Sequence, residues 1–144
     1  LHWRSPAPVT AGQGVIQDSP DGVEWLSWND EAVQAARAAG RPVLVDFTAK
    51  WCLTCKANKA LAIEIDAVRE KLKEIDAVAF RADYTDKNPR ITEELHRYGR
   101  AGVPMVLVFT PDPEGPAEVL PTALTPGIVL EALDRAAGIE RTES

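Results

Sequence analysis

The sequence predicts an α/β fold in which helices cover both faces of one central, mixed β-sheet. Strand-like apolar runs alternate with helical segments in the order β-α-β-α-β-α-β-β-α, and this alternation is typical of a sheet flanked by helices. A proline-rich turn at 110–116 separates the last two strand-like runs, which predicts a hairpin. The length of 144 residues and the apolar content of 45% suit one domain.

The first 23 residues have the composition of loops and linkers, with several prolines and glycines and no apolar periodicity. We therefore expect a flexible linker over 1–23, a folded domain over 24–138 and a short tail over 139–144. Within the linker, Trp3 fits either a membrane-interface aromatic or a partly buried residue of a tail.

The first folded elements are expected to be a short strand within 23–28 and the helix that follows it. Asn29 is a favourable N-cap for this helix, because acidic residues occupy the first turn after it. Gly40 is expected to end the helix. Trp25 and Trp28 are interpreted mainly as core residues.

The run at 43–48 is β-branched and apolar, so it predicts a buried strand. A helix follows it, with an expected break or kink at 62–65 and a helical continuation over 66–75. Thr125 is the expected N-cap of the last helix and Pro126 its first residue. The other strands and helices are expected at 78–82, 91–97, 105–109, 117–120 and 126–138.

Chemistry is concentrated in the chain's only two cysteines, Cys52 and Cys55, which directly follow the strand at 43–48. A zinc site would need two more ligands, and the chain offers only His2 and His96, which are not at ligand spacing. A purely structural disulfide would close so short a loop that it removes little chain entropy. Two inert core thiols are a further alternative, but this motif favours redox activity most.

The position of the pair at the start of a helix predicts a division of labour. Cys52 falls at the helix N-terminus, where unpaired N–H groups and the helix dipole lower the pKa of a thiol. Cys52 is therefore the expected nucleophile. Cys55 lies one turn further in, should be more buried, and is the expected resolving thiol.

The residues around the pair resemble a known family. The segment 46–56, Asp-Phe-Thr-Ala-Lys-Trp-Cys-Leu-Thr-Cys-Lys, resembles the active-site segment of the thioredoxin superfamily. The segment 98–109 resembles the stretch that carries the cis-proline of that family. The resemblance covers about residues 24–137 and implies a thioredoxin-like fold. It also implies a cis peptide bond before Pro104 and backbone hydrogen bonds from Val103 to an extended substrate.

A more specific resemblance is to the C-terminal thioredoxin-like domain of the transmembrane thiol:disulfide interchange proteins of DsbD type. It is carried by the Trp-Cys-Leu-Thr-Cys-Lys-Ala-Asn run at 51–58, by Trp25-Leu26-Ser27-Trp28 and by the tail at 120–127. It implies a protein-disulfide reductase that takes electrons from a membrane-embedded dithiol donor domain, which could belong to the same full-length protein. The electrons would pass to disulfide-bearing proteins of the periplasm, including the pathway of cytochrome c biogenesis. It further implies a periplasmic domain that residues 1–23 tether to the inner membrane.

Asp46 is the expected proton carrier of the site. It lies in a strand suited to burial, so its pKa should rise, and the family assigns the matching Asp to proton exchange at Cys55. The alternative is an Asp that pairs with a cation or faces solvent. Arg81 matches a cationic position near this Asp in thioredoxins, and pairing would keep Asp46 ionised more readily. Lys50, two residues before Cys52, should modestly favour the thiolate.

Four residues are expected to form the surface on which partners dock: Trp51, Leu53, Val103 and Pro104. Leu53 and Thr54 stand between the cysteines, where strong oxidases of the DsbA type carry a histidine that stabilises the thiolate. The missing histidine argues for an electron donor over a strong oxidant. A disulfide oxidase or isomerase remains an alternative, as does a non-catalytic module that binds extended peptides at Pro104.

Composition and charge limit the classes of partner that the chain can bind. The net charge of −6 argues against nucleic-acid binding through a basic face. No apolar run approaches the roughly 18 residues that span a bilayer. The chain starts without Met and shows no signal-peptide core, so we expect an excised or processed piece. We expect no metal, no cofactor and a monomeric domain.

Overall fold

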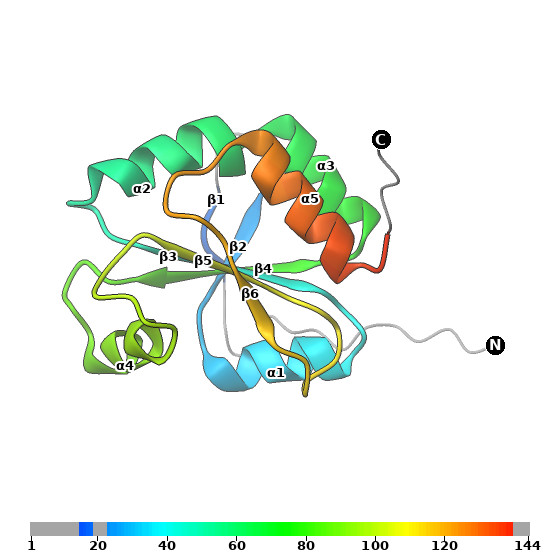
Figure 1. Ribbon diagram of the computed structural model, residues 1–144, viewed down its shortest axis with the longest axis horizontal. Helices are drawn as coiled ribbons and strands as arrows, with labels where there is room; N and C mark the ends of the chain where they lie inside the picture. Colours follow the sequence, from blue (N-terminus) through cyan, green and yellow to red (C-terminus); the bar gives the residue numbers. More distant parts are fainter. Residues whose placement is uncertain (1–14, 19–22, 140–144) are drawn as a thin grey trace.

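The computed structural model describes residues 15–18 and 23–139 and consists of one sheet between two layers of helices (Figure 1). The sheet has six strands in the order β1-β2-β4-β3-β5-β6. Strands β2, β4 and β3 run parallel, whereas β1, β5 and β6 pair antiparallel with their neighbours. The strands are β1 Val15–Asp18, β2 Glu24–Ser27, β3 Val43–Thr48, β4 Val78–Asp83, β5 Met105–Phe109 and β6 Ala117–Val119. This mixed sheet confirms the predicted fold class.

Helices cover both faces, as expected. The helices are α1 Asp30–Ala38, α2 Leu53–Asn58, the π-helix η1 Lys59–Ile63, α3 Asp66–Glu74, α4 Pro89–Arg97 and α5 Pro126–Ala136. In Figure 1, α1 and α4 lie below the sheet, whereas α2, α3 and α5 lie above it. Each face has a buried apolar cluster. We call them the α1–α4 core, which includes Val33, Phe47 and Leu95, and the α3–α5 core, which includes Trp25 and Leu133.

Helix caps follow the sequence closely. The Asn29 side chain accepts a hydrogen bond from the Ala32 amide at 3.0 Å, and the Thr125 hydroxyl accepts one from the Ile128 amide at 3.2 Å. Gly40 adopts a φ of +85°, which an L-residue with a side chain rarely adopts. The described helices include none with the length and apolar content needed to cross a membrane.

The N-terminal region differs from the prediction. Residues 15–18 belong to the stretch 1–23 that we expected to be a linker, yet they form β1 and pair with β2 in the register Val15↔Leu26 and Asp18↔Glu24. The prediction of a flexible linker is therefore wrong for these four residues. An edge strand is defined by its hydrogen bonds to a neighbour, and a four-residue strand carries little periodicity of its own. Trp3 and the expected tail beyond residue 139 lie outside the described residues.

The helix that leaves the cysteines is interrupted, as predicted for 62–65. It continues from α2 into the π-helix η1, which ends at Ile63. Glu64 follows with φ −90° and ψ 64°, and Ile65 is the extended residue that precedes α3. Isolated π-helical turns are often found at functional sites. Here the interruption leaves Glu64 between two helical segments, where its side chain reaches the sheet.

Candidate active site

Strand β3 leads to the two cysteines at the start of α2. Cys52 is the N-cap, with extended backbone angles of φ −97° and ψ 109°. Cys52 and Cys55 form a disulfide, and the Cys55 amide also donates a hydrogen bond to the Cys52 Sγ at 3.0 Å. The same N–H would stabilise a negative charge on the Cys52 sulfur once the disulfide is reduced.

The two cysteines differ in burial in the expected direction. Cys52 is 7% exposed and Cys55 is 2% exposed, and both belong to the α1–α4 core. Cys52 is therefore the more accessible of the two residues to a partner. This agrees with attack at Cys52 and resolution by Cys55, which remain predictions.

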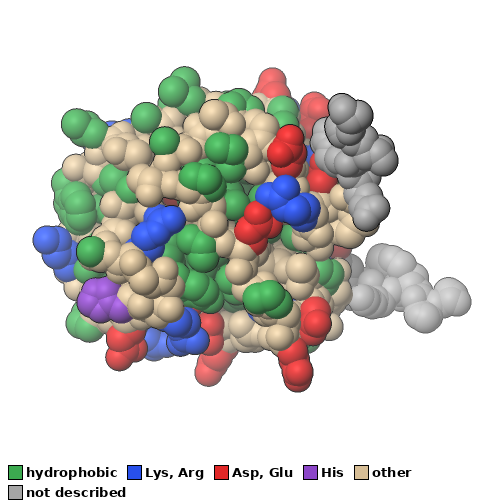
Figure 2. Space-filling model, viewed as in Figure 1, with side chains coloured by type: hydrophobic (Ala, Val, Ile, Leu, Met, Phe, Trp, Pro, Cys, Tyr) green, Lys and Arg blue, Asp and Glu red, His purple; other side chains and the backbone are tan. Residues whose placement is uncertain are grey.

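An apolar surface surrounds the start of α2. Trp51 is 51% exposed and Leu53 is 78% exposed. The Trp51 indole N–H donates to the Thr85 carbonyl at 3.1 Å, and its ring lies 6.4 Å from that of Tyr84. Figure 2 shows hydrophobic side chains on the surface at the left of the view, where Figure 1 places the start of α2. Trp51 is thus anchored to the loop after β4 while keeping a large exposed area.

The loop before β5 carries the predicted cis peptide bond between Val103 and Pro104. Val103 is partly buried against the α1–α4 core, the cluster that contains both cysteines. Arg100 holds this loop, because its Nη1 donates to the Pro104 carbonyl at 2.8 Å and its Nη2 to the Leu120 carbonyl at 2.9 Å. Val103 therefore packs against the apolar cluster to which both cysteines belong.

A second polar anchor ties α2 to the segment before α5. Asn58, the last residue of α2, is 5% exposed. Its Nδ2 donates to the Thr122 carbonyl at 2.9 Å, and its Oδ1 accepts from the Leu124 amide at 3.1 Å. Both the nitrogen and the oxygen of the Asn58 side-chain amide thereby help to fix the position of the helix that carries the cysteines.

Asp46 lies inside a buried charge cluster. The sheet register places Asp46 of β3 opposite Arg81 of β4, and the Arg81 Nη2 lies 3.2 Å from the Asp46 Oδ2. The same nitrogen lies 2.8 Å from the Oε2 of Glu64. The side chains of Asp46 and Arg81 are each 4% exposed and that of Glu64 is 13% exposed. One guanidinium is thus shared by two carboxylates.

Burial raises the pKa of the Asp46 carboxyl above its ordinary value. The positive charges of Arg81 and Lys59 oppose that rise, and the negative charge of Glu64 adds to it. The predicted rise in the pKa of Asp46 is present, and so is the pairing with Arg81 that we considered as the alternative. The rise prevails because Asp46 is removed from water and Arg81 is not its exclusive partner.

The guanidinium of Arg81 has hydrogen-bond donors that the two carboxylates do not use. Its Nε and Nη1 have no hydrogen-bond partner among the described residues, and its plane stacks over the Trp25 ring with the carbon Cζ 3.9 Å from the ring centroid. A hollow of about 340 Å³ opens beside it, lined by Ser27, Thr48, Ala49, Lys50, Lys59, Arg81 and Asp83. The charge cluster is therefore close to the surface although Asp46 and Arg81 are buried.

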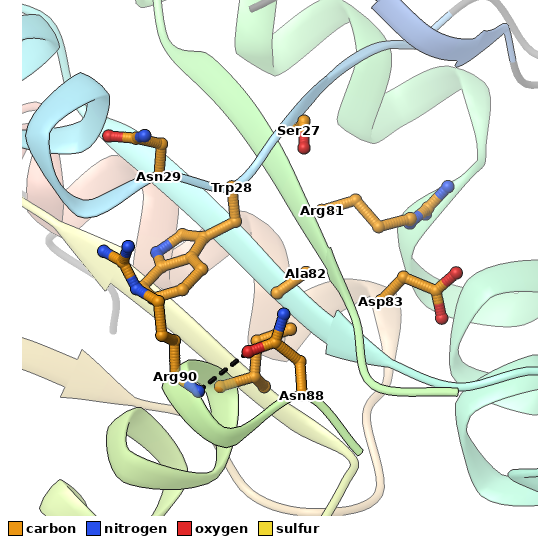
Figure 3. A pocket seen from close by; sticks show the side chains of 9 residues that line it. Ser27, Trp28, Asn29, Arg81, Ala82, Asp83, Asn88 and Arg90 are labelled. Atoms are coloured by element: carbon orange, nitrogen blue, oxygen red, sulfur yellow. Dashed lines mark hydrogen bonds between the residues drawn. The ribbon is translucent and has the colours of Figure 1, made fainter. Parts of the chain in front are cut away.

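A second hollow, of about 300 Å³, lies at the ends of β2 and β4 (Figure 3). Figure 3 shows the side chains of Arg81 and Asp83 on one side of β4, and those of Ala82 and Trp28 on the other. Alternation along β4 thus directs Arg81 toward the face that carries α2 and α3. On the α4 side of this hollow, the Asn88 side chain accepts a hydrogen bond from the Arg90 amide at 2.7 Å.

Sequence reasoning missed Glu64, Asn58 and Arg100. Each makes its contacts with residues at least four positions away, through hydrogen bonds that leave no periodic pattern in the sequence. The one available signal was the expected break at 62–65, which contains Glu64.

The described residues include no group of three or more His, Cys, Asp or Glu side chains placed to hold a metal ion.

Comparison with known proteins agrees with this geometry. A family model described as thioredoxin-like matches residues 24–111. The chain belongs to the thioredoxin-like family. It is 39% identical over 87 residues to the thiol:disulfide interchange protein DsbD of Ralstonia nicotianae, a match that covers 60% of this chain and 14% of that protein. It is 37% identical over 82 residues to DsbD 1 of Pseudomonas aeruginosa, covering 57% of this chain and 14% of that protein.

Solved structures give the same result for the domain. The oxidised C-terminal domain of Neisseria meningitidis DsbD superposes with a TM-score of 0.59 at 25% identity, covering 76% of this chain and 97% of that one. A thioredoxin from Thermus thermophilus, at 24% identity and a TM-score of 0.62, covers 78% of this chain and 85% of that one and supports the fold. The resemblance to the C-terminal domain of DsbD-type proteins is confirmed, whereas the chain spans only about a seventh of the curated DsbD proteins.

These observations define the chemistry of the site. A thioredoxin-like domain with a Cys52–Cys55 disulfide at the N-cap of α2 supports thiol–disulfide exchange, and the site is that of a disulfide oxidoreductase.

Proposed function

We propose that this thioredoxin-like domain is a thiol:disulfide reductase that relays electrons by dithiol–disulfide exchange. The electrons come from a membrane-embedded dithiol donor domain and go to disulfide-bearing proteins of the periplasm. The observation that carries the proposal is the Cys52–Cys55 disulfide with Cys52 as the N-cap of α2. The name thiol:disulfide interchange protein, which the DsbD relatives bear, supports the same reaction class.

Exchange at the site proceeds in two displacements. The Cys52 thiolate attacks a partner disulfide, so that a bond forms between Cys52 and one partner sulfur while the other partner sulfur leaves as a thiolate. Cys55 then loses its proton, attacks the Cys52 sulfur and expels the second partner sulfur as a thiolate. The partner gains two electrons and the Cys52–Cys55 pair loses two. The donor domain restores the dithiol by the reverse sequence.

Asp46 is proposed to take the Cys55 proton in the second displacement. Its burial raises the pKa of its carboxyl, which makes the carboxylate a stronger base than an exposed aspartate. Its position supports this role, because alternation along β3 places it on the face of the sheet that α2 covers.

The docking surface is proposed to combine Trp51 and Leu53 with Val103 and Pro104. The first two expose large apolar areas at the start of α2, and Val103 packs against the cluster that contains the cysteines. An extended partner segment lying along the loop before β5 would present its disulfide to Cys52. The residues between the cysteines, Leu53 and Thr54, favour the reductase direction over strong oxidation.

We propose that the domain works as part of a longer membrane protein of the DsbD type. The chain spans 14% of the Ralstonia nicotianae and Pseudomonas aeruginosa proteins, and residues before the sheet would tether it at the periplasmic face of the inner membrane. Because β1 pairs with β2, we place the start of the folded domain at residue 15, ahead of the residue 24 first expected, and its end at 138.

Single cysteine variants test the proposal. Reduction of glutathione disulfide with dithiothreitol as the donor should be lost in Cys52→Ser. The Cys55→Ser protein should instead accumulate a mixed disulfide between Cys52 and glutathione, visible by mass spectrometry. Thr54→Ala is the matched control, since Thr54 is exposed between the two cysteines, and it should keep turning over. A Cys52→Ser protein that still reduces disulfides catalytically would contradict the proposal.

A further inference from the structure

The proposed function leaves one feature of the site unexplained, which is the second carboxylate on Arg81. Glu64 lies on neither a strand nor a regular helix. The end of the π-helix η1 and the start of α3 place it there, and its Oε2 approaches the Arg81 Nη2 more closely than Asp46 does, at 2.8 Å against 3.2 Å. A guanidinium has five N–H donors, yet both carboxylates use the same nitrogen.

We propose that Glu64 is a positioning residue that draws the Arg81 guanidinium away from Asp46 and thereby sets how readily Asp46 accepts a proton during exchange. This inference rests on the proposed function, because it concerns the proton step of the same dithiol. Its physical basis is competition, since one cation near two carboxylates stabilises the ionised form of each less than it would stabilise either alone.

The geometry gives the competition its direction. The side chains of Asp46 and Arg81 are each 4% exposed. Water therefore cannot replace the stabilisation that the Asp46 carboxylate loses when Glu64 shares the Arg81 guanidinium. Glu64 acts in two ways, because it shares the cation and also adds a negative charge to the cluster. Both effects favour the protonated form of Asp46. Burial is the largest cause of the raised pKa of the Asp46 carboxyl, and the negative charge of Glu64 adds to it.

The other charges around the cluster come from different elements. Lys59 of η1 acts on Asp46 in the opposite sense to Glu64. Lys50 and Asp83 line the hollow beside Arg81 together with Lys59. Lys50 and Asp83 are exposed at the rim, where solvent screens them more than it screens the buried cluster. Lys59 is half-buried and lowers the pKa of Asp46 more than Glu64 raises it. Glu64 is therefore the carboxylate that bears most directly on the division of the Arg81 charge.

The mechanism needs such an adjustment. With Arg81 to itself, Asp46 would be a weak base that stays ionised and takes a proton from Cys55 poorly. With no cation nearby, it would stay protonated over a wider pH range and could not accept the proton within that range. A shared cation places Asp46 between these limits, which is what a group that accepts and then releases a proton in each cycle requires.

The test is the titration of Asp46 in the oxidised protein, followed by NMR of the ¹³C-labelled aspartate carboxyls and assigned with Asp46→Asn. Glu64→Gln keeps the shape of the side chain and removes its charge. It should lower the pH midpoint of Asp46 by about one unit, the lower end of the shift that a neighbouring arginine produces. Glu70→Gln, an exposed carboxylate of α3, is the matched control and should leave the midpoint unchanged.

The second measurement is the pH dependence of the exchange rate with glutathione disulfide. In Glu64→Gln the rate should persist to a lower pH, by about the same one unit, and its plateau should fall because Asp46 is then a weaker base. A purely structural role for Glu64 would lower the rate by one factor at every pH. Glu64→Ala serves as a second variant and should shift both profiles in the same direction.

Several results would overturn the proposal. They are an Asp46 midpoint equal to that of the Glu70→Gln control, a midpoint that rises, a shifted midpoint without a shifted rate profile, and loss of the fold in both Glu64 variants. The last result would assign Glu64 a structural role. Failure of the proposed reductase function would appear separately, as absent exchange in the unmodified protein, while the Asp46 titration would still report on Glu64.

Discussion

Two buried arginines on opposite faces of the sheet hold their charges in different ways. Arg37 of α1 is 2% exposed and Arg81 of β4 is 4% exposed, and each stacks on an aromatic ring, with Cζ 4.6 Å from the Phe109 centroid and 3.9 Å from the Trp25 centroid. Arg37 donates only to backbone carbonyls in its hydrogen bonds, whereas Arg81 donates to two carboxylates.

The partners decide what each arginine does. Arg37 donates to the carbonyls of Thr110 at 2.8 Å, of Asp112, and of Gly115 at 3.0 Å, and so closes the turn between β5 and β6. Carbonyls do not titrate, so this contact is constant across the pH range. The partners of Arg81 are carboxylates, which change charge, and one of them belongs to the proposed proton path. A buried cation among carbonyls is a structural clamp, and a buried cation among carboxylates is coupled to protons.

The largest expected effect on stability is that of Arg81→Met. Removing one partner of a buried ion pair leaves uncompensated charge, so the free energy of unfolding should fall by about 3–5 kcal/mol at pH 7. The loss should shrink as the pH is lowered, because protonated carboxyls need no counter-ion. Urea unfolding at a series of pH values measures both effects. A loss that is independent of pH would remove the distinction from Arg37.

Arg37→Met should come next, with a loss of about 2–4 kcal/mol, because three carbonyls lose a charged donor and the turn at 110–116 is released. The same urea series should show a nearly constant loss with pH, because Asp112, the carboxylate whose charge acts on Arg37, is exposed. The pH profile of exchange should match that of the unmodified protein. A changed profile would show that the clamp also acts on the dithiol.

Asp46→Asn should change stability less, and in the favourable direction. Burial raises the pKa of Asp46 in the folded protein, so the folded state binds the proton more tightly than the unfolded state. The stability that Asp46 contributes is then complete below its unfolded pKa of about 3.9 and is lost as the pH rises through the folded pKa. The asparagine protein should therefore be more stable at pH 8, with the difference vanishing near pH 4.

The smallest effect should come from an arginine on the surface. Arg135 of α5 binds Glu118 of β6 through two nitrogens, but their side chains are 56% and 39% exposed. Water and salt screen such a pair, so Arg135→Met should cost less than about 1 kcal/mol, and 1 M NaCl should reduce that cost further. A loss as large as that of Arg37→Met would mean that burial is not what separates these arginines.

The parts of the fold that the sequence predicts are those with local causes. The buried strand at 43–48, the caps at Asn29 and Thr125, and the break near Glu64 all follow from patterns within a few residues. The exception at the start of the sheet is β1, which exists because it pairs with β2. A strand of four residues at a sheet edge has too little pattern to separate it from a loop.

The site divides in the same way. The cysteine pair and the cis bond at Pro104 were expected from the motifs, whereas the pairing of Asp46 with Arg81 was only an alternative. The contacts of Glu64 and Asn58 depend on which distant residues the fold places beside them, and the sequence does not show this. What a motif predicts is which groups react, and what the tertiary structure adds is how their charges are shared.

The measurement that tests the central claim most directly is the equilibrium reduction potential of the Cys52–Cys55 pair, followed by tryptophan fluorescence in glutathione or dithiothreitol buffers. An electron donor should have a potential of roughly −230 to −270 mV, near that of thioredoxin. A value of roughly −120 to −180 mV would contradict the account and indicate an oxidase or isomerase.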